Sequence, residues 1–148
     1  MRPSVVEQLT GSCRILETVV APCVDDPFAR TILGNLVANL RMLAGALPGI
    51  APFLREDNAE TARLLEQLRE AVPAELQVRI ANALAEPDAD PADSIALDDR
   101  NTALRALLAE AVGQSSLTPD QHRSVLRRMT ERAARAPMRY VATSSPSA

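Results

Sequence analysis

Apolar residues recur every three or four positions along almost the whole chain, and this feature most limits what it can fold into. Leu and Ala dominate the sequence, and β-branched residues are sparse. A spacing of three and four places apolar side chains on one face of an α-helix, whereas a half-buried strand alternates. No segment alternates in that way. The pattern therefore predicts an all-α fold, an antiparallel bundle of five or six helices.

Capping residues predict where the first two helices begin. Ser4, with Glu7 three residues later, has the spacing of a capping box. Asp26-Pro27 places a capping carboxylate before a proline suited to the first helical position. This second helix is apolar around most of its circumference, so we expect it to be central and to end near Leu47, where a Pro- and Gly-rich stretch, Pro48 to Pro52, follows.

The remaining helices are predicted from the same kinds of signal. A third helix should start near Asp57, with Glu60 completing a box-like spacing, and Pro73 should divide it from a fourth over about 74–86. A fifth, over about 98–112, is expected to follow the caps Asp98 and Asp99 and to stop at Gly113. A sixth opens at Thr118-Pro119-Asp120-Gln121, a second capping box, and continues to about Arg135.

Composition also sets the expected domain organisation. A chain of 148 residues is long enough for one hydrophobic core. Residues 87–94 carry two prolines and three carboxylates, which predicts a flexible acidic loop, and residues 137–148 end in a Ser-rich stretch, which predicts a flexible tail. We therefore expect a single helical domain over residues 1–136.

The short inventory of reactive side chains excludes several kinds of chemistry. All 16 basic residues are Arg, so the chain has no lysine for a phosphate-binding loop or a Schiff base. His122 is the only histidine, and Cys13 and Cys23 are the only cysteines, too few for a disulfide framework or a zinc knuckle. We expect no catalytic residues, no metal and no cofactor, and a reducing cytoplasm as the location.

No targeting or membrane segment is predicted. The N-terminus lacks the unbroken apolar region of a secretory signal. The least polar stretch, residues 31–54, is interrupted by Asn35, Asn39 and Arg41, so it is expected to be a buried helix rather than a membrane span.

Charge is unevenly distributed along the chain. The formal net charge is +1 over residues 1–55, −8 over 56–110 and +4 over 111–148. The sixth helix should carry a basic stripe of Arg123, Arg127, Arg128, Arg132 and Arg135. The favoured interpretation is a solvated face that pairs with the acidic middle of the chain. An acidic protein or nucleotide ligand is an alternative, and nucleic acid is a weaker one because stacking aromatics are almost absent.

A small or polar strip interrupts the apolar second helix. It consists of Gly34, Asn35, Ala38, Asn39 and Gly45. The strip could line a ligand pocket or a subunit contact, but close packing of another helix against its small residues is the default expectation.

Three short stretches carry a family resemblance. They are Arg2-Pro3-Ser4 leading to Glu7-Gln8-Leu9, then Val37-Ala38-Asn39, and finally Met138-Arg139-Tyr140. They resemble motifs of small helical bacterial proteins of uncharacterised function that accompany aminoglycoside-phosphotransferase-like kinases and acyl-CoA dehydrogenases. The chain departs from that pattern because Ala136-Pro137-Met138 stands where Asn-Pro should precede Arg-Tyr. The resemblance implies a non-catalytic subunit supporting a kinase that acts on hydroxyacyl-CoA, with Asn39, Arg139 and Tyr140 at the partner contact.

Two functions are therefore predicted. The leading one is a non-catalytic accessory protein that binds a partner enzyme, such as that kinase, through an apolar helix face with an Arg-rich rim. Its candidate partner-binding residues are Asn39, Arg123, Arg127, Arg139 and Tyr140. The alternative is a helical bundle that binds acyl-CoA or another small anion through Arg side chains and the Asn35/Asn39 strip. Neither prediction involves nucleic acid or a membrane, and a homo-oligomer is compatible with both.

Overall fold

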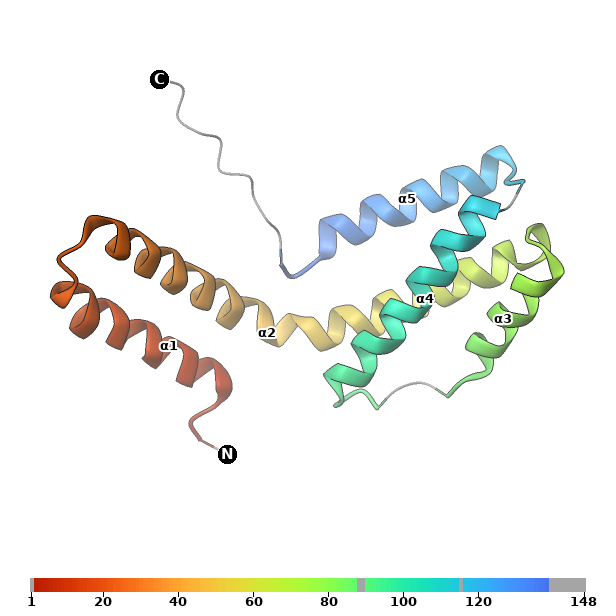
Figure 1. Ribbon diagram of the computed structural model, residues 1–148. Helices are drawn as coiled ribbons and strands as arrows, with labels where there is room; N and C mark the ends of the chain where they lie inside the picture. Colours follow the sequence, from red (N-terminus) through yellow and green to blue (C-terminus); the bar gives the residue numbers. More distant parts are fainter. Residues whose placement is uncertain (1, 88–89, 115, 139–148) are drawn as a thin grey trace, which may run out of the picture. The chain divides into compact units, whose positions relative to one another are not determined.

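The computed structural model describes residues 2–87, 90–114 and 116–138 (Figure 1). It is 85% helical, without strands over these residues, and this confirms the predicted all-α bundle. The elements follow one another as α1 (Val5–Ile15), the π-helical turn η1 (Leu16–Val20), the 3-10 turn η2 (Ala21–Cys23), α2 (Pro27–Leu68), the 3-10 turn η3 (Arg69–Ala71), α3 (Ala74–Ala85), α4 (Ser94–Gln114) and α5 (Pro119–Arg135).

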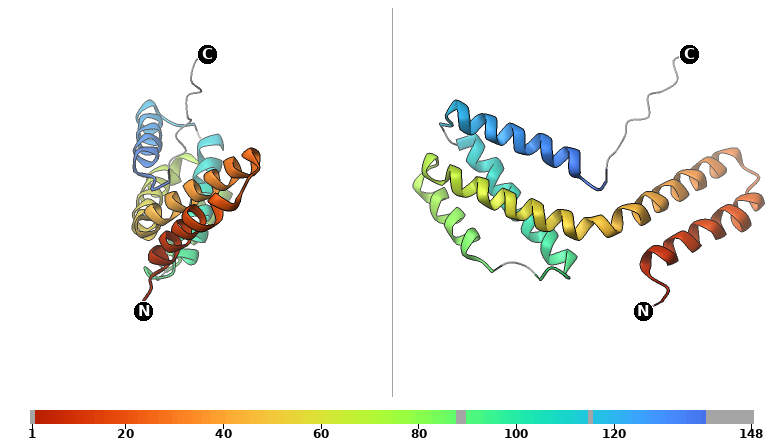
Figure 2. Two further views of the ribbon diagram at one scale, coloured as in Figure 1. Left: turned by 90° about the vertical axis from the view of Figure 1, so that its left-hand side faces the viewer. Right: turned by 180° about the vertical axis from the view of Figure 1, so that it is seen from behind.

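The chain divides into two compact units. Unit 1 contains residues 2–49 of the described chain together with Pro137 and Met138, and unit 2 contains residues 50–136. In unit 1, α1 runs antiparallel beside the first half of α2, as the view from behind also shows (Figure 2). In unit 2, the second half of α2 packs with α3, α4 and α5. That residues 1–136 form a single domain stays a prediction.

Three of the capping signals in the sequence, at Ser4, Asp26 and Thr118, are confirmed. The Ser4 hydroxyl accepts from the Glu7 N–H, and the Glu7 side chain accepts from the Ser4 N–H, so both halves of the capping box are present. Thr118 and Gln121 form the same arrangement at the start of α5. At the start of α2, Asp26 Oδ1 accepts from the N–H groups of Phe28 and Ala29 at 2.7 and 3.2 Å.

The prediction that the second helix ends near Leu47 is wrong, because α2 continues through Pro48 and Pro52 to Leu68. Proline has a backbone φ that suits a helix, but each proline removes one hydrogen bond and crowds the preceding turn, at about 3 kcal/mol. Burial of side chains farther along the same helix, including Leu54, Leu65 and Leu68, offsets that cost. A third helix does not start near Asp57; this residue lies in the interior of α2.

The core of unit 2 is aliphatic. Leu65 and Leu68 of α2, Ile80 of α3 and Ala111 of α4 are fully buried and belong to one cluster. Val125 of α5 joins it at 4% exposure. The predicted fourth helix is confirmed as α3, which starts directly after Pro73. Four helical segments therefore share this core.

The predicted bounds of the fifth helix are wrong at both ends. Helix α4 begins at Ser94 because Asp93 caps it: Asp93 Oδ1 accepts from the N–H groups of Ile95 and Ala96 at 3.0 Å each. Asp98 and Asp99 are not caps, since they lie inside the helix. Gly113 also lies inside the helix and has no positive φ, so it is not a left-handed cap.

The predicted loop and tail fall partly outside the described residues. Pro87 and Asp90 to Asp93 lie outside the helices, and residues 88–89 are not described. Of the tail, which the sequence predicts from residue 137 onward, only Pro137 and Met138 are described. The flexibility of both segments stays a prediction.

Candidate functional site

An exposed apolar stripe runs along the first half of α2 in unit 1. Phe28 is 75% exposed, Ile32 53% and Leu36 47%, and Leu43 and Leu47 are each 38% exposed. Asn39 is exposed on the same side of the helix, between Leu36 and Leu43. We call the set Phe28, Ile32, Leu36, Asn39, Leu43 and Leu47 the α2 stripe. The expectation that this apolar helix is central and buried is wrong for these residues.

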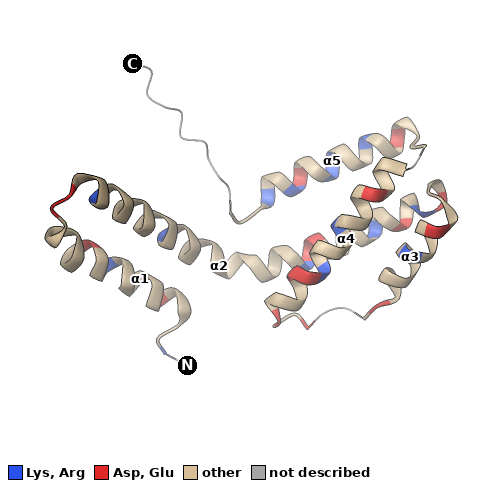
Figure 3. Cartoon of the chain, in the orientation of Figure 1, with Lys and Arg blue, Asp and Glu red and all other residues tan. Residues whose placement is uncertain are grey.

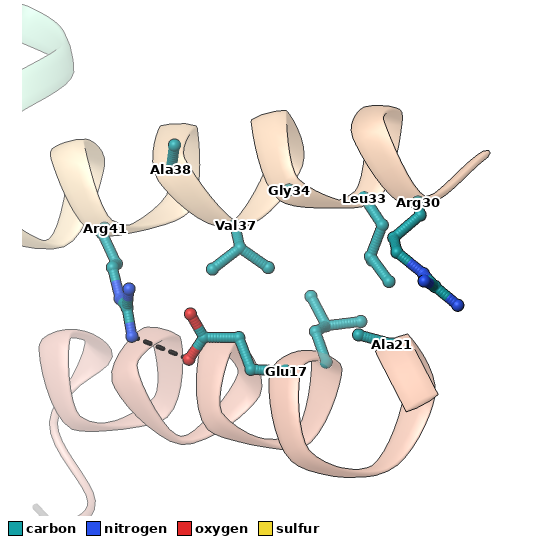
Figure 4. A pocket seen from close by; sticks show the side chains of 9 residues that line it. Glu17, Ala21, Arg30, Leu33, Gly34, Val37, Ala38 and Arg41 are labelled. Atoms are coloured by element: carbon teal, nitrogen blue, oxygen red, sulfur yellow. Dashed lines mark hydrogen bonds and ion pairs between the residues drawn. The ribbon is translucent and has the colours of Figure 1, made fainter. Parts of the chain in front are cut away.

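The α2 stripe is left uncovered because α1 packs against a different side of α2. Val37 is buried there, and the thiol of the buried Cys13 lies 3.8 Å from the Val37 carbonyl oxygen. Arg41 of α2 donates to Glu17 at 2.7 Å (Figure 4). Here α1 and η1 cover the side of α2 that carries Val37 and Arg41, and the stripe lies on another side of the helix.

A hollow of about 240 Å³ lies between η1 and α2 in unit 1. Gly34 and Ala38 lie on its α2 wall, beside the Glu17–Arg41 ion pair (Figure 4). A Cβ atom built on Gly34 or Gly45 would meet nothing within 4 Å. The default expectation of close helix packing at these glycines is therefore wrong.

A buried polar cluster centres on Asp57 in unit 2. Asp57 is 1% exposed and accepts hydrogen bonds from three side chains: Asn101 Nδ2 at 2.7 Å, Arg132 Nε at 2.9 Å and Arg128 Nη2. Asn101 also donates to Asn58 Oδ1 at 2.8 Å, and Asn58 donates to the Leu97 carbonyl at 2.9 Å. The cluster therefore links α2 to both α4 and α5.

The hydrogen bonds decide the ionisation of Asp57. Burial raises the pKa of its carboxyl, but the hydrogen bonds from Asn101, Arg132 and Arg128 and the charge of Arg132 lower it by more. The net pKa of Asp57 lies below its ordinary value, so the carboxylate is ionised at neutral pH. Such a group is held by permanent cations and is a structural anion rather than a general acid.

Arg128 is the cation buried with it. Its Nη1 lies 3.1 Å from Glu60 Oε2, within ion-pair distance, but the geometry gives no hydrogen bond, and Nε also lacks a partner among the described residues. Arg135 pairs with Glu56 at 2.7 Å and with Glu60. The hydrogen bond from Arg135 is the main cause that lowers the pKa of Glu60.

The basic stripe of α5 thus divides into paired and outward-facing residues. Arg128, Arg132 and Arg135 pair with Asp57, Glu60 and Glu56 of α2, and Figure 3 shows blue and red positions on both helices. The expected pairing with the acidic middle of the chain is therefore present, but the face is not fully solvated as expected, because Arg128 is buried. Arg123 pairs with Asp120 on its own helix and stays 73% exposed. Arg127 is exposed and forms no ion pair with the residues that the structure describes.

A second hollow, of about 250 Å³, lies between α4 and α5 in unit 2. Arg105, Arg128 and Arg132 contribute to its wall, and the rest is mainly apolar. Arg132 also lies over the Phe53 ring, 5.5 Å from its centroid. The remaining lining residues are Thr61, Leu108, Ala109, Met129 and Ala133. Arg128 and Arg132 pair with Asp57, whereas Arg105 is exposed and forms no ion pair with the described residues, so Arg105 is the guanidinium of this wall that a small anion could contact.

The sequence-predicted partner-binding residues fall into three groups. Asn39 is exposed in unit 1, within the α2 stripe. Arg123 and Arg127 lie one turn apart on the exposed side of α5 in unit 2. Arg139 and Tyr140 lie outside the described residues.

Two polar residues of the Asp57 cluster, Asn101 and Asn58, were not predicted from the sequence. Asn101 is 3% exposed and Asn58 is 6% exposed. Asn101 stands in register with the apolar positions Leu97, Leu104 and Leu108, and an amide at such a position signals a buried hydrogen-bonding partner. That periodicity could have identified it.

Side chains that could bind a metal do not cluster among the described residues. His122 and Cys23 are exposed and Cys13 is buried. Over residues 2–87, 90–114 and 116–138, no three His, Cys, Asp or Glu side chains converge as metal ligands would.

One helical stretch of the described chain, Pro27–Ala71, is long and apolar enough to cross a membrane by length and composition alone. Its most apolar window has a mean hydropathy of 1.3 and is 17% buried. Core helices of soluble proteins can pass the same test, but low burial sets this one apart from them.

Comparison of the chain with protein-family models, with curated proteins and with solved structures finds no match.

Proposed function

We propose that this protein is a non-catalytic interaction protein that associates with another protein through the α2 stripe. The observation that carries the proposal is the exposure of five large apolar side chains in a row on one helix. The largest exposed apolar patch of a monomer is often a functional surface, and larger patches mark sites of protein or membrane interaction. The stripe also has the spacing by which a helix docks on another helix.

The buried polar cluster supports a structural rather than a catalytic role for unit 2. Asp57 is held as an anion by Arg128 and Arg132, and its pKa is lowered, which is the opposite of what a general acid at neutral pH requires. The cluster fixes α5 against α2. On this proposal the protein works without a catalytic residue, metal or cofactor of its own, in the cytoplasm.

The partner that the sequence resemblance implies is a phosphotransferase-like kinase acting on hydroxyacyl-CoA, with the protein as its accessory subunit. Asn39 is the one residue proposed from that resemblance that lies in the α2 stripe. A partner helix with an apolar face would cover the five apolar side chains and bond to the Asn39 amide.

The test is capture of the tagged chain with its bound proteins from its native cells, compared with two variants. Leu36→Glu places a charge in the middle of the α2 stripe and should abolish retention of a partner. Ile95→Glu places the same charge on an exposed apolar residue of α4 in unit 2, outside the stripe, and should leave retention unchanged. Loss of the partner in both variants, or in neither, would contradict the proposal.

A second candidate function, binding of acyl-CoA or another small anion, is favoured by the hollow that carries Arg105, Arg128 and Arg132. Its volume of about 250 Å³ is near the lower limit of ligand pockets. A ligand that binds the folded state raises the melting temperature. A rise with acyl-CoA that Arg105→Gln removes would support this function, and no rise across acyl-CoAs and nucleotides would reject it.

A further inference from the structure

The spacing within the α2 stripe is the same when read from either end. The intervals between Phe28, Ile32, Leu36, Asn39, Leu43 and Leu47 are four, four, three, four and four residues. The stripe therefore consists of two ridges of three residues, each with a spacing of four. Ridges of this kind interdigitate when two helices pack against each other.

From this symmetry we propose that the occupant of the α2 stripe is the α2 stripe of a second copy, in antiparallel orientation. The inference rests on the proposed function, because it keeps the α2 stripe as a protein-binding surface and names a second copy, in place of the kinase, as the chain that covers it. A two-fold axis between residues 37 and 38 sets Phe28 opposite Leu47 and Ile32 opposite Leu43. Leu36 then faces Asn39, and each contact occurs twice.

The polar groups of unit 1 are compatible with this pairing. No charged residue belongs to the stripe, so two copies bring no like charges together. Arg41 is paired with Glu17, and Arg30 donates to the Val24 carbonyl at 2.6 and 3.1 Å. Both cations are thus engaged within their own unit.

Asn39 sets the register of the pair. The two Asn39 residues lie next to the two-fold axis, about 4.5 Å apart along the helix direction, because three residues of helix span that length. An amide both donates and accepts, so two symmetry-related amides can bond to each other. A single Asn in an apolar helix seam is a known device for fixing register. In a lipid environment the same amide would be without a partner, which favours a protein occupant.

The size of the stripe fits a reversible dimer. It extends over about 30 Å of helix. Five large side chains that are each between a third and three quarters exposed offer on the order of 400–500 Å² per copy. Two copies would bury roughly 1,000 Å², at the lower end for a specific interface. We expect dissociation in the micromolar range.

The experiment is sedimentation velocity of the full chain from about 1 to 200 µM, with four samples beside the wild type. Ile32→Glu and Leu43→Arg should each leave the chain monomeric, because each places an unpaired charge in the interface twice. Mixed in equal amounts, the two variants should dimerise again. The antiparallel register sets the new carboxylate at position 32 of one copy against the new guanidinium at position 43 of the other, and the second contact stays native. Ile95→Glu, outside the stripe, should dimerise as the wild type does. Circular dichroism checks that every variant is folded.

Three results would overturn the inference. A wild type that stays monomeric at the highest concentration shows that no second copy binds. Single variants that still dimerise show that another surface is used. Single variants that lose the dimer without rescue in the mixture exclude the antiparallel register.

The experiments can reject the second copy as occupant without rejecting the proposed function. If the wild type is monomeric and Leu36→Glu still loses its captured partner, the function stands and the second copy is excluded. If the wild-type monomer instead binds phosphatidylcholine vesicles and Phe28→Asp abolishes that binding, the occupant is a lipid surface, and both proposals fall.

Discussion

Asp57 of α2 and Arg128 of α5 form a buried ion pair although 71 residues separate them in the chain. Asp57 is 1% exposed, and Asn101 of α4 donates to the same carboxylate. A buried ion pair adds little net stability over an apolar pair of the same shape, but removal of one partner leaves a charge without compensation. The cluster therefore joins α2, α4 and α5 through one carboxylate.

Loss of Asp57 should destabilise unit 2 strongly. Asp57→Ala would leave Arg128 buried without its main counter-ion, and we expect a loss of about 3–5 kcal/mol in the free energy of unfolding. Urea denaturation followed by circular dichroism measures it. Glu66→Ala removes an exposed pair between α2 and Arg69 of the adjoining turn η3, and it should change stability by less than about 0.5 kcal/mol. Equal losses in the two variants would contradict the role given to Asp57.

The same carboxylate should make the fold sensitive to acid. The pKa values of Asp57 and Glu60 are lowered in the folded chain, so the unfolded chain takes up protons first as the pH falls. Their contribution to stability is complete above the unfolded carboxyl pKa values, about 3.9 and 4.3, and is lost as the pH falls through the lower folded values.

Thermal melts between about pH 3 and 7 test this linkage. The wild-type melting temperature should fall steeply in the acid part of that range, and Asp57→Asn, which cannot titrate, should flatten the fall while lowering stability at neutral pH. A variant with the same steep pH dependence as the wild type would show that other carboxylates govern acid unfolding.

Loss of the Asn101 amide should lower the free energy of unfolding by more than loss of an amide on the exposed side of a helix. Asn101→Leu keeps a similar volume but removes the donor to Asp57 and Asn58, and we expect a loss of about 1–3 kcal/mol. It should also raise the pKa of Asp57, since that hydrogen bond lowers it, and so move acid unfolding to higher pH. Asn82→Leu on the exposed side of α3 is the matched control. A stability loss without a shift in acid unfolding would separate packing from the hydrogen bond.

The sequence predicted those features that depend on residues close together in the chain. Ser4, Asp26 and Thr118 cap helices in the structure as their spacing indicated, because a cap is formed by residues within one turn. The all-α fold follows from a periodicity that extends over most of the chain. These features need no knowledge of which helix packs on which.

Features that depend on distant residues could not be predicted in the same way. Asp57 and Glu60 have the spacing of a helix start, but they also lie one turn apart on a continuous helix, and only α5 decides between these alternatives. The exposure of Phe28 and Ile32 has the same origin. Their helix is apolar enough for a core, but in the described part of unit 1 α1 and η1 cover the side of α2 that carries Val37 and Arg41, and Phe28 and Ile32 lie on another side.

The continuity of α2 through Pro48 and Pro52 gives the last prediction. A proline in a helix interior costs about 3 kcal/mol relative to alanine, so Pro48→Ala and Pro52→Ala should each raise stability, by about 1–3 kcal/mol after the entropy that proline removes from the unfolded chain is allowed for. Pro119→Ala is the control, because Pro119 occupies the first turn of α5, where proline is favoured and no gain is expected. Urea denaturation followed by circular dichroism compares the three variants. If α2 were interrupted at residues 48–52, replacing these prolines would remove a favourable restriction of a loop, and stability would stay the same or fall.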